Sequence, residues 1–142
     1  AKVSGTTVSY KDKNLVTGKK YYYKIKGYKK VGQTTYKGSK SKASKAYPKP
    51  AKVKITSIKS TAKGAKLYWK KVAGASGYVI YRSESKTGKY TKIKEIKKQT
   101  KISYNNTGLL KGKTYYYKVM AYRNMSGIYV YGKYSTVKQI RK

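Results

Sequence analysis

One stretch of this chain occurs twice. Leu109 to Tyr122 reads LLKGKTYYYKVMAY, and Leu15 to Tyr28 reads LVTGKKYYYKIKGY. A shift of 94 residues aligns positions 8–41 with positions 102–135 without a gap, and 12 of these 34 pairs are identical. Self-similarity at a fixed period is the signature of a repeat architecture. We therefore predict a tandem repeat, cut out of phase so that only the second copy is complete.

The repeated stretch has the period of a β-strand. Tyr115, Tyr117 and Val119 fall on one face of an extended segment, and the residues between them fall on the other. Three consecutive tyrosines would each lose side-chain freedom in a helix, whereas aromatic and β-branched residues fit a pleated sheet. Gly112 is typical of a turn that leads into the strand. The pattern predicts an all-β chain.

The residues around this strand resemble a known family. Leu109, Gly112 and Tyr115 are similar to the Leu, Gly and Tyr of a corner in fibronectin type III domains, where the tyrosine hydroxyl bonds back to nearby backbone. Trp69, in KLYWKKV, resembles the core tryptophan of that family, and GYVIYR from Gly77 resembles the strand that follows it. The resemblance implies an immunoglobulin-like antiparallel β-sandwich. It covers residues 51–142 in full and residues 1–47 only in the later strands.

The residues of the repeat and their spacing show a second resemblance. AGASGYVIYRS followed by LLKGKTYYYKVMAY is similar to the Lys- and Tyr-rich repeats of secreted bacterial surface proteins of the Gram-positive type. This resemblance implies secretion and a location at the cell surface or in the cell wall. No apolar run approaches 18 residues, so we expect no transmembrane segment. Residue 1 is Ala, without a Met or a signal peptide before it, which indicates a mature or trimmed product.

Two prolines mark the expected domain boundary. Pro48 and Pro50 favour extended polyproline geometry and cannot continue a central strand. We predict the C-terminal half of a module over residues 1–47 and a complete module over residues 48–142. Strands are expected at 53–59, 65–71, 77–82 and 90–96, from 102 to 104, along the repeated stretch and at 131–140. The predicted core consists of Leu67, Trp69, Tyr78, Ile80, Tyr115, Tyr117 and Val119.

The first 47 residues supply about three of the seven strands of such a sandwich. We expect residues 8–10 to end one strand, Tyr21, Tyr23 and Ile25 to point inward on the next, and a last strand to lie near residues 34–44. Such a half would expose an apolar face and open edges. Three explanations stay open: the chain is a fragment of a longer array, strands from another molecule complete it, or the half packs on its neighbour or stays mobile.

The charge is strongly one-sided. The chain has 37 Lys and Arg against 3 Asp and Glu, a net charge of +34, and such a field attracts polyanions. Only Arg82, Arg123 and Arg141 are arginines. Lysine is a mobile point charge rather than a planar fork, which favours diffuse attraction over geometric recognition. The alternative interpretation is that the lysines form a soluble surface and nothing more.

The chain lacks the residue types that catalytic, metal and cofactor sites usually require. The chain has no His and no Cys, and its three acids are scattered, so we expect no metal site, no acid–base pair and no activated nucleophile. GLLKGKT at 108–114 resembles a phosphate-binding loop, but its first glycine is one residue too close and a strand follows where a helix is required. We predict no catalysis and no cofactor.

One constellation remains, in which tyrosines alternate with lysines on the outward face of the repeated strand. Tyrosine rings can stack on sugar rings or bases while lysines neutralise phosphates. Outward tyrosines also stabilise cross-strand pairs without binding anything, and this alternative stays open. The candidate surface consists of Tyr22, Lys24, Lys26, Tyr28, Tyr116, Lys118 and Tyr122.

These observations predict a non-catalytic extracellular spacer or adhesive module. Its lysine-rich surface would hold anionic envelope polymers such as teichoic acid, or another anionic surface, through many weak contacts. The alternative is a structural subunit of an extracellular filament, in which copies of the chain complete one another by strand exchange. We expect nucleic acid to bind only non-specifically, because arginine is scarce and no recognition helix is expected.

Overall fold

Every regular element of the chain is a β-strand, and all pairs of strands are antiparallel. The computed structural model describes residues 1–142 and divides them into two compact units, Ala1–Pro48 and Lys49–Lys142. We refer to these as the N-terminal unit and the C-terminal unit. The all-β prediction is confirmed.

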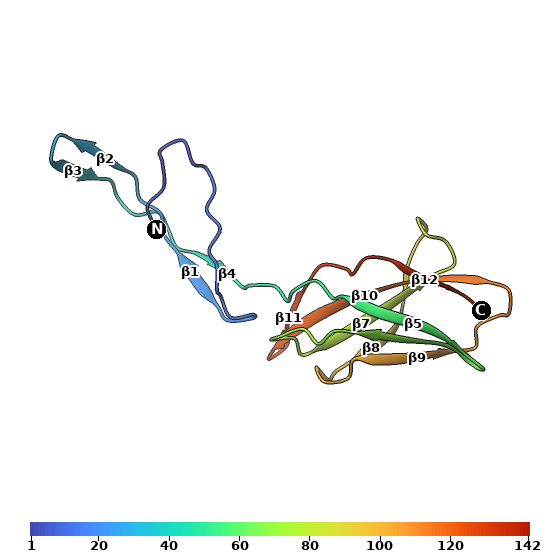
Figure 1. Cartoon of the computed structure of the whole chain (residues 1–142). Helices are drawn as coiled ribbons and strands as arrows, with labels where there is room; N and C mark the ends of the chain where they lie inside the picture. The colour runs from blue at the N-terminus through green and yellow to red at the C-terminus, as the bar shows by residue number, and fades with distance from the viewer. The chain divides into compact units, whose positions relative to one another are not determined.

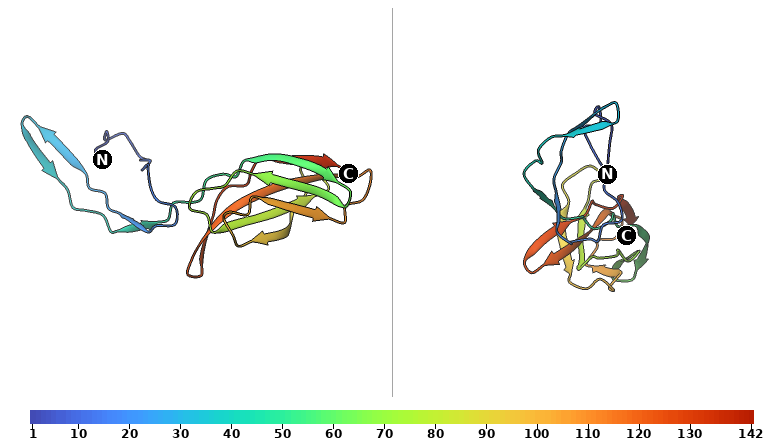
Figure 2. Two further views of the ribbon diagram at one scale, coloured as in Figure 1. Left: turned by 60° about the horizontal axis from the view of Figure 1, so that its bottom comes forward. Right: turned by 90° about the vertical axis from the view of Figure 1, so that its left-hand side faces the viewer.

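Two sheets form the C-terminal unit (Figures 1 and 2). The first has the order β5 (Ile55–Thr61), β6 (Gly64–Trp69) and β9 (Ser103–Thr107). The second has the order β11 (Ile128–Tyr131), β10 (Thr114–Met125), β7 (Gly77–Ser83) and β8 (Thr91–Ile96), and β12 (Lys138–Arg141) also pairs with β10. One hydrophobic core joins the two sheets into a sandwich.

The core lies between the sheets, where the period-two pattern placed it. Trp69 on β6 meets Tyr78 on β7 edge to face, with 5.3 Å between the ring centroids. Such aromatic pairs contribute roughly 0.5–1.5 kcal/mol beyond the area that they bury. The sequence prediction of the core is confirmed, since every one of its residues is buried: Leu67, Trp69, Tyr78, Ile80, Tyr115, Tyr117 and Val119.

The buried tyrosines of this core have partners for their hydroxyl groups. The Tyr115 hydroxyl accepts a hydrogen bond from the Leu110 amide at 3.1 Å, which confirms the predicted corner. The Tyr117 hydroxyl donates to Oδ1 of Asn106 at 3.0 Å. Because an unpaired buried hydroxyl costs roughly 1–3 kcal/mol, these bonds let a core without phenylalanine form.

The strand boundaries differ from the prediction near the C-terminus. We expected one strand at 131–140, but β11 ends at Tyr131 and β12 begins at Lys138. The chain turns earlier, at Ser126 and Gly127, which have φ values of 51° and 94°. A two-residue turn with positive φ at both positions matches the twist of a hairpin. The turn folds β11 back along the end of β10.

The N-terminal unit contains four short strands in two pairs. β1 (Tyr21–Tyr23) pairs with β4 (Ser44–Ala46), and β2 (Tyr28–Val31) pairs with β3 (Thr34–Lys37). The expected strand at residues 8–10 is absent, and so is an inward position for Ile25, which is 77% exposed. In the C-terminal unit the strand equivalent to 8–10 pairs with β6, and the N-terminal unit has no counterpart of β6. These two expectations are wrong for that reason.

The pairing of the N-terminal strands repeats that of the C-terminal strands at the offset of 94 residues. Tyr21 pairs with Ala46 as Tyr115 pairs with Ile140. The side chain of Ser41 bonds the Ile25 amide at 3.0 Å, as Ser135 bonds that of Val119 at 3.0 Å. The β2–β3 hairpin likewise has the register of β10 with β11. The N-terminal unit therefore has the backbone pairing of β10–β12 without a counterpart of β7, which pairs with the other edge of β10.

Candidate functional site: an aromatic and lysine surface

The outer face of β10 carries the candidate residues of the C-terminal unit. Lys118 lies half-buried among rings, with its Nζ 3.9 Å from the ring centroid of Tyr90 and 5.8 Å from that of Tyr134. Tyr116 is also half-buried on this face. The lysine at the centre of the face is therefore held against aromatic rings by cation–π interactions, and it is less available to bind an anion.

The expectation that Tyr122 belongs to the exposed surface is wrong. Its side chain is only 2% exposed. The β11 hairpin places Tyr129 and Tyr131 against it, with ring centroids 5.5 and 6.1 Å away. On its other side the Tyr122 hydroxyl lies against Gly77, where an added Cβ would come within 2.8 Å of the hydroxyl and would clash with the backbone carbonyl of Ile96. Alternation along β10 gave the correct face, but the hairpin covers that face.

Sequence reasoning missed the tyrosines that surround these candidates. Tyr81 and Tyr134 meet edge to face at 5.2 Å, and Tyr129 and Tyr131 stack at 6.1 Å with 18° between their planes. The available signal was the alternation in IYVY after Ser126-Gly127, a turn sequence that predicts a hairpin. The outer face is thus a cluster of tyrosines: Tyr81, Tyr90, Tyr116, Tyr122, Tyr129, Tyr131 and Tyr134.

Burial and one acid shape the electrostatics of this face. Burial raises the pKa of Tyr81 and of Tyr122 to about 12, because the phenolate is the form that loses solvation. The hydrogen bond from Lys92 to Glu95, 2.6 Å long, lowers the pKa of that carboxyl. These tyrosines are therefore neutral at physiological pH and act through their rings and hydroxyls.

The equivalent candidates in the N-terminal unit are open to solvent. Tyr22 is 64% exposed and Tyr28 is 49% exposed, and Lys24 and Lys26 are exposed between them. Tyr28 lacks the covering rings of Tyr122, because the residues at the offset of 94 from Tyr129 and Tyr131 are Thr35 and Lys37. Four of the candidates lie on the exposed segment 22–28 of the N-terminal unit, where Lys24 and Lys26 fall between β1 and β2, and the other three lie on the packed aromatic face of the C-terminal unit.

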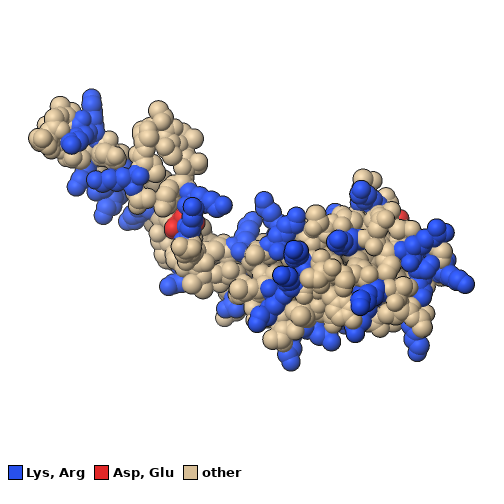
Figure 3. Space-filling model, in the orientation of Figure 1, with Lys and Arg blue, Asp and Glu red and all other residues tan.

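Lysine and arginine side chains are spread over both units, as the space-filling view shows (Figure 3). The structure has two salt bridges, Lys92 with Glu95 and Lys113 with Glu84. Of 37 basic side chains, 37 − 2 = 35 therefore have no carboxylate partner. No His, Cys, Asp or Glu cluster of three or more could hold a metal ion, and no helix is long and apolar enough to cross a membrane.

The loop that resembles a phosphate-binding motif has a structural role. Gly108 and Gly112 have positive φ values of 71° and 81° and frame the corner, which leads directly into β10. Gly112 donates its amide to the Lys142 carbonyl at 2.6 Å. A strand rather than a helix follows, so no row of free helix amides faces the loop.

Comparison with known proteins identifies the fold. No protein-family model matches the chain, and no curated protein sequence matches it. A Fn3-like protein from Clostridium thermocellum is 27% identical to this chain. The match covers 62% of this chain and 86% of the Clostridium chain, with a TM-score of 0.45. The fibronectin type III domain of the human KIAA0970 protein is 18% identical, with coverage of 65% and 71% and a TM-score of 0.46.

A third similar structure spans more of the chain. The FN1–FN3 domains of chicken CNTN1 are 20% identical over 94% of this chain, with a TM-score of 0.53. The match spans 46% of the chicken chain. This similarity, the sheet order and the tyrosine corner agree with the resemblance found in the sequence. The chain has an all-β sandwich fold of the fibronectin type III, immunoglobulin-like kind.

Proposed function

We propose that the chain is a non-catalytic module of an extracellular bacterial surface protein. Its lysine-rich surface holds anionic envelope polymers such as the poly(glycerol phosphate) of teichoic acid. The single observation that carries the proposal is the set of 35 basic side chains without a carboxylate partner. A surface needs far fewer unpaired charges to stay soluble, since a net charge of about 2–8 suffices for a small domain.

The spread of the charge favours diffuse retention over a defined pocket. The candidate segment at residues 22–28 of the N-terminal unit is exposed, and the equivalent face of the C-terminal unit is filled by its own tyrosines. Each lysine–phosphate contact is weak, but contacts along one polymer add because each bound phosphate holds the next one near the surface. The expected binding depends on the number of lysines and not on their pattern.

Binding of poly(glycerol phosphate) by the full chain tests the proposal. We expect retention at about 0.15 M salt and release at about 1 M, where the screening length falls from roughly 8 Å to roughly 3 Å. Dextran, which has no charge, should not bind at either salt concentration. Retention that survives about 1 M salt, or equal retention of dextran, would contradict the proposal.

A pair of variants separates diffuse from local binding. Lys24→Gln with Lys26→Gln removes two lysines from the candidate segment at residues 22–28, and Lys29→Gln with Lys30→Gln removes two from the neighbouring hairpin. All four are exposed. Because total charge governs the binding, both double variants should lower the affinity for poly(glycerol phosphate) by the same factor. A much larger loss for the first pair would show instead that the candidate segment forms a local site.

A further inference from the structure

The outer face of the sheet β11–β10–β7–β8 carries a buried layer of its own. Val79, Met120 and Tyr122 are buried, yet they are not part of the core between the two sheets. Cross-strand partners share one face of a sheet. Glu95, opposite Val79, and Tyr131, opposite Tyr122, therefore lie on this outer face as well. The exposed side chains of the face rest on packed neighbours, which hold them in place.

Two tyrosine rings reach the solvent from this layer. Tyr129 is 41% exposed and Tyr131 is 44% exposed. Their rings lie nearly parallel, with 18° between the planes, and both pack against the buried ring of Tyr122. A side chain that packing already holds loses little conformational entropy when a ligand binds to it. We refer to Tyr129 and Tyr131 as the tyrosine pair.

The surface at the tyrosine pair is close to neutral in a strongly basic chain. Residues 124–132 contain no charged side chain. Lys92 lies near the pair, but it is bonded to Glu95 at 2.6 Å. This hydrogen bond is the main cause that raises the pKa of Lys92, and the nearby hydroxyls of the tyrosine pair raise it further. Because the two charges offset each other, a polyanion gains less here than on the lysine-rich surface elsewhere.

The ion pair supplies hydrogen-bonding groups beside the rings. The side chain of Lys92 is 52% exposed and that of Glu95 is 25% exposed. Burial first, and then the nearby Glu95 carboxylate, raise the pKa of Tyr122, so this carboxylate lies beside the ring on which the tyrosine pair rests. An ammonium has several donors and a carboxylate has several acceptor sites. A ligand that fits this surface therefore needs an apolar face for the rings and hydroxyl groups for the ion pair.

We propose that the tyrosine pair, with Lys92 and Glu95, binds a neutral glycan of the cellulose or chitin type, a β-1,4-linked chain of pyranose rings. The C–H groups of such a ring form an apolar face that stacks on a tyrosine, while the hydroxyls at its edge donate to Glu95 and accept from Lys92. This site acts beside the diffuse retention of polyanions and does not depend on it.

The arrangement of the tyrosine pair favours a stiff, extended chain. Tyr129 and Tyr131 are two positions apart on β11, so they present their rings on one face along the direction of the strand. A β-1,4-linked chain keeps its successive sugar rings in line. Dextran is linked through an exocyclic carbon, which adds a rotatable bond for each sugar, and ordering these bonds costs affinity. Dextran is therefore the matched control ligand.

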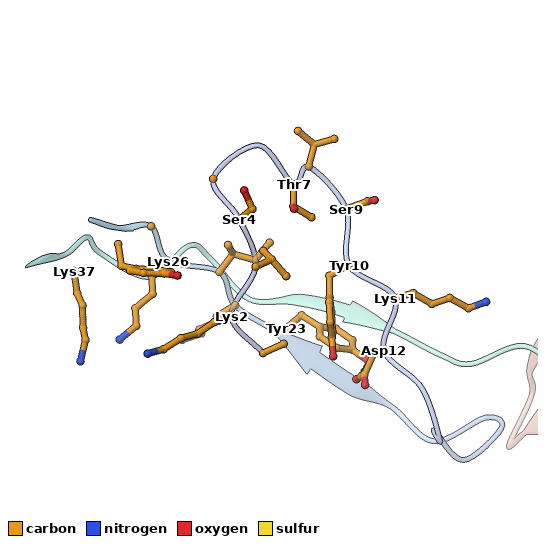
Figure 4. A pocket seen from close by; sticks show the side chains of 18 of the residues that line it. Lys2, Ser4, Thr7, Ser9, Tyr10, Lys11, Asp12, Tyr23, Lys26 and Lys37 are labelled. Atoms are coloured by element: carbon orange, nitrogen blue, oxygen red, sulfur yellow. Dashed lines mark hydrogen bonds between the residues drawn. The ribbon is translucent and has the colours of Figure 1, made fainter. Parts of the chain in front are cut away.

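The N-terminal unit serves as a control within the same chain. Its one acid, Asp12, accepts a hydrogen bond from the Tyr23 hydroxyl at 3.1 Å and forms no salt bridge (Figure 4). β3 has one tyrosine, the exposed Tyr36, which lies between Thr35 and Lys37. No pair of rings therefore lies beside a lysine–carboxylate pair in this unit, and we expect the glycan to bind only to the C-terminal unit.

The test titrates the isotopically labelled full chain with cellotetraose and, separately, with chitotetraose at about 1 M salt. The screening length is then roughly 3 Å, so the binding of poly(glycerol phosphate) is suppressed and the two proposals can fail independently. We expect saturable amide shifts in the NMR spectrum at residues 92–95 and 129–131 with at least one of the two sugars, and none with dextran. The sugar that binds more tightly shows whether an acetamido group is recognised. The absence of saturable shifts with both sugars, or saturable shifts only at other residues, would overturn the proposal.

Two substitutions of one tyrosine separate stacking from support of the fold. Tyr129→Leu keeps an apolar cover over Tyr122 but removes the flat ring, so it should weaken glycan binding by at least about fivefold, on the scale measured for bases stacked on aromatic side chains. Tyr129→Phe keeps the ring and should cost much less. Tyr36→Leu should have no effect. Urea unfolding followed by Trp69 fluorescence verifies that each variant is folded. Equal losses for Tyr129→Leu and Tyr129→Phe, or none for Tyr129→Leu, would contradict stacking on this ring.

The polar half of the site has a variant with opposite effects on the two ligands. Glu95→Gln replaces charge-assisted hydrogen bonds from sugar hydroxyls by weaker neutral ones, so it should lower the affinity for the glycan. The same change removes a negative charge, so it should slightly raise the affinity for poly(glycerol phosphate) at about 0.15 M salt. Unchanged affinity for the glycan would remove Glu95 from the site.

A second copy of the chain is the competing occupant of this face. β11 is the outermost strand of its sheet and carries no charge, and such an edge can pair with the same edge of another molecule. Pairing of this kind would shift the amides of residues 128–131 as the concentration of the protein rises, without any glycan. That result would overturn the assignment of the face to a glycan.

Discussion

The two units use the same backbone pairing and differ in what covers it. β1 and β4 have the register of β10 and β12, and both units close the corner with a tyrosine hydroxyl bonded to a backbone amide at 3.1 Å. Yet Val119 is fully buried, whereas Ile25 at the same place in the repeat is 77% exposed. Short-range sequence is thus sufficient for turns and register, while burial requires strands from elsewhere.

This difference has a consequence for stability. Hydrophobic burial is the dominant favourable term in folding, so a unit with satisfied hydrogen bonds and an open core has little to oppose chain entropy. The C-terminal unit has both the bonds and the core. We therefore expect substitutions at equivalent positions to have large effects in the C-terminal unit and small effects in the N-terminal unit.

The largest contrast should come from truncating the central tyrosine. Tyr117→Ala removes a fully buried ring, and we expect it to lower the free energy of unfolding by about 3–5 kcal/mol. Tyr23→Ala, at the equivalent position, should leave that transition unchanged. Urea unfolding followed by the fluorescence of Trp69, the chain's one tryptophan, reports on the C-terminal unit alone. Equal losses in both variants would contradict the difference in burial.

A smaller contrast is expected from the serine whose side chain accepts a hydrogen bond from a backbone amide, Ser135 in the C-terminal unit and Ser41 in the N-terminal unit. Ser135→Ala leaves the buried Val119 amide without its partner, which should cost about 1–3 kcal/mol in the same urea experiment. Ser41→Ala should speed exchange of the Ile25 amide by a small factor, since water reaches that exposed group. If Ser41→Ala unfolded β1 and β4 outright, the N-terminal unit would be more cooperative than its exposure indicates.

The corner hydroxyl should have a smaller effect still. Tyr115→Phe keeps the buried ring and removes the acceptor of the Leu110 amide, so we expect a loss of about 0.5–1.5 kcal/mol. Tyr21→Phe removes the acceptor of the Val16 amide, which should exchange faster while Trp69 fluorescence is unaffected. A change in the unfolding midpoint of the C-terminal unit by Tyr21→Phe would show that the two units unfold together.

Alkaline pH should destabilise the C-terminal unit, whereas its stability near neutral pH should not depend on its tyrosine hydroxyls. Burial raises the pKa of Tyr81, Tyr117 and Tyr122 from 10.0 to about 12, so folding favours their neutral forms. Their contribution to stability is complete below pH 10 and is lost as the pH rises from about 10 to about 12. Trp69 fluorescence and tyrosinate absorbance should change together in that range. A cooperative loss that ends below pH 10 would contradict this assignment.

The outcome at β10 shows where sequence reasoning stops. Alternation assigned Tyr115, Tyr117 and Val119 to the core, and all three are buried. The same rule left Tyr122 on the outer face but could not tell that Tyr129 and Tyr131 would cover it. Whether a side chain on the outer face meets solvent depends on the twist of a neighbouring hairpin, which the pattern of one strand does not contain.

By itself, the sequence determined the repeat, its register and the excess of unpaired positive charge, because each depends on residue spacing or residue type alone. Only the tertiary structure decided which copies of the repeated residues are buried. It also brought Arg82 onto Asn106, which are 24 positions apart in the chain, and left Asp12 without such a partner. The physical reason is that burial and charge pairing depend on strands that meet from distant parts of the chain, whereas turns and strand period depend on neighbours.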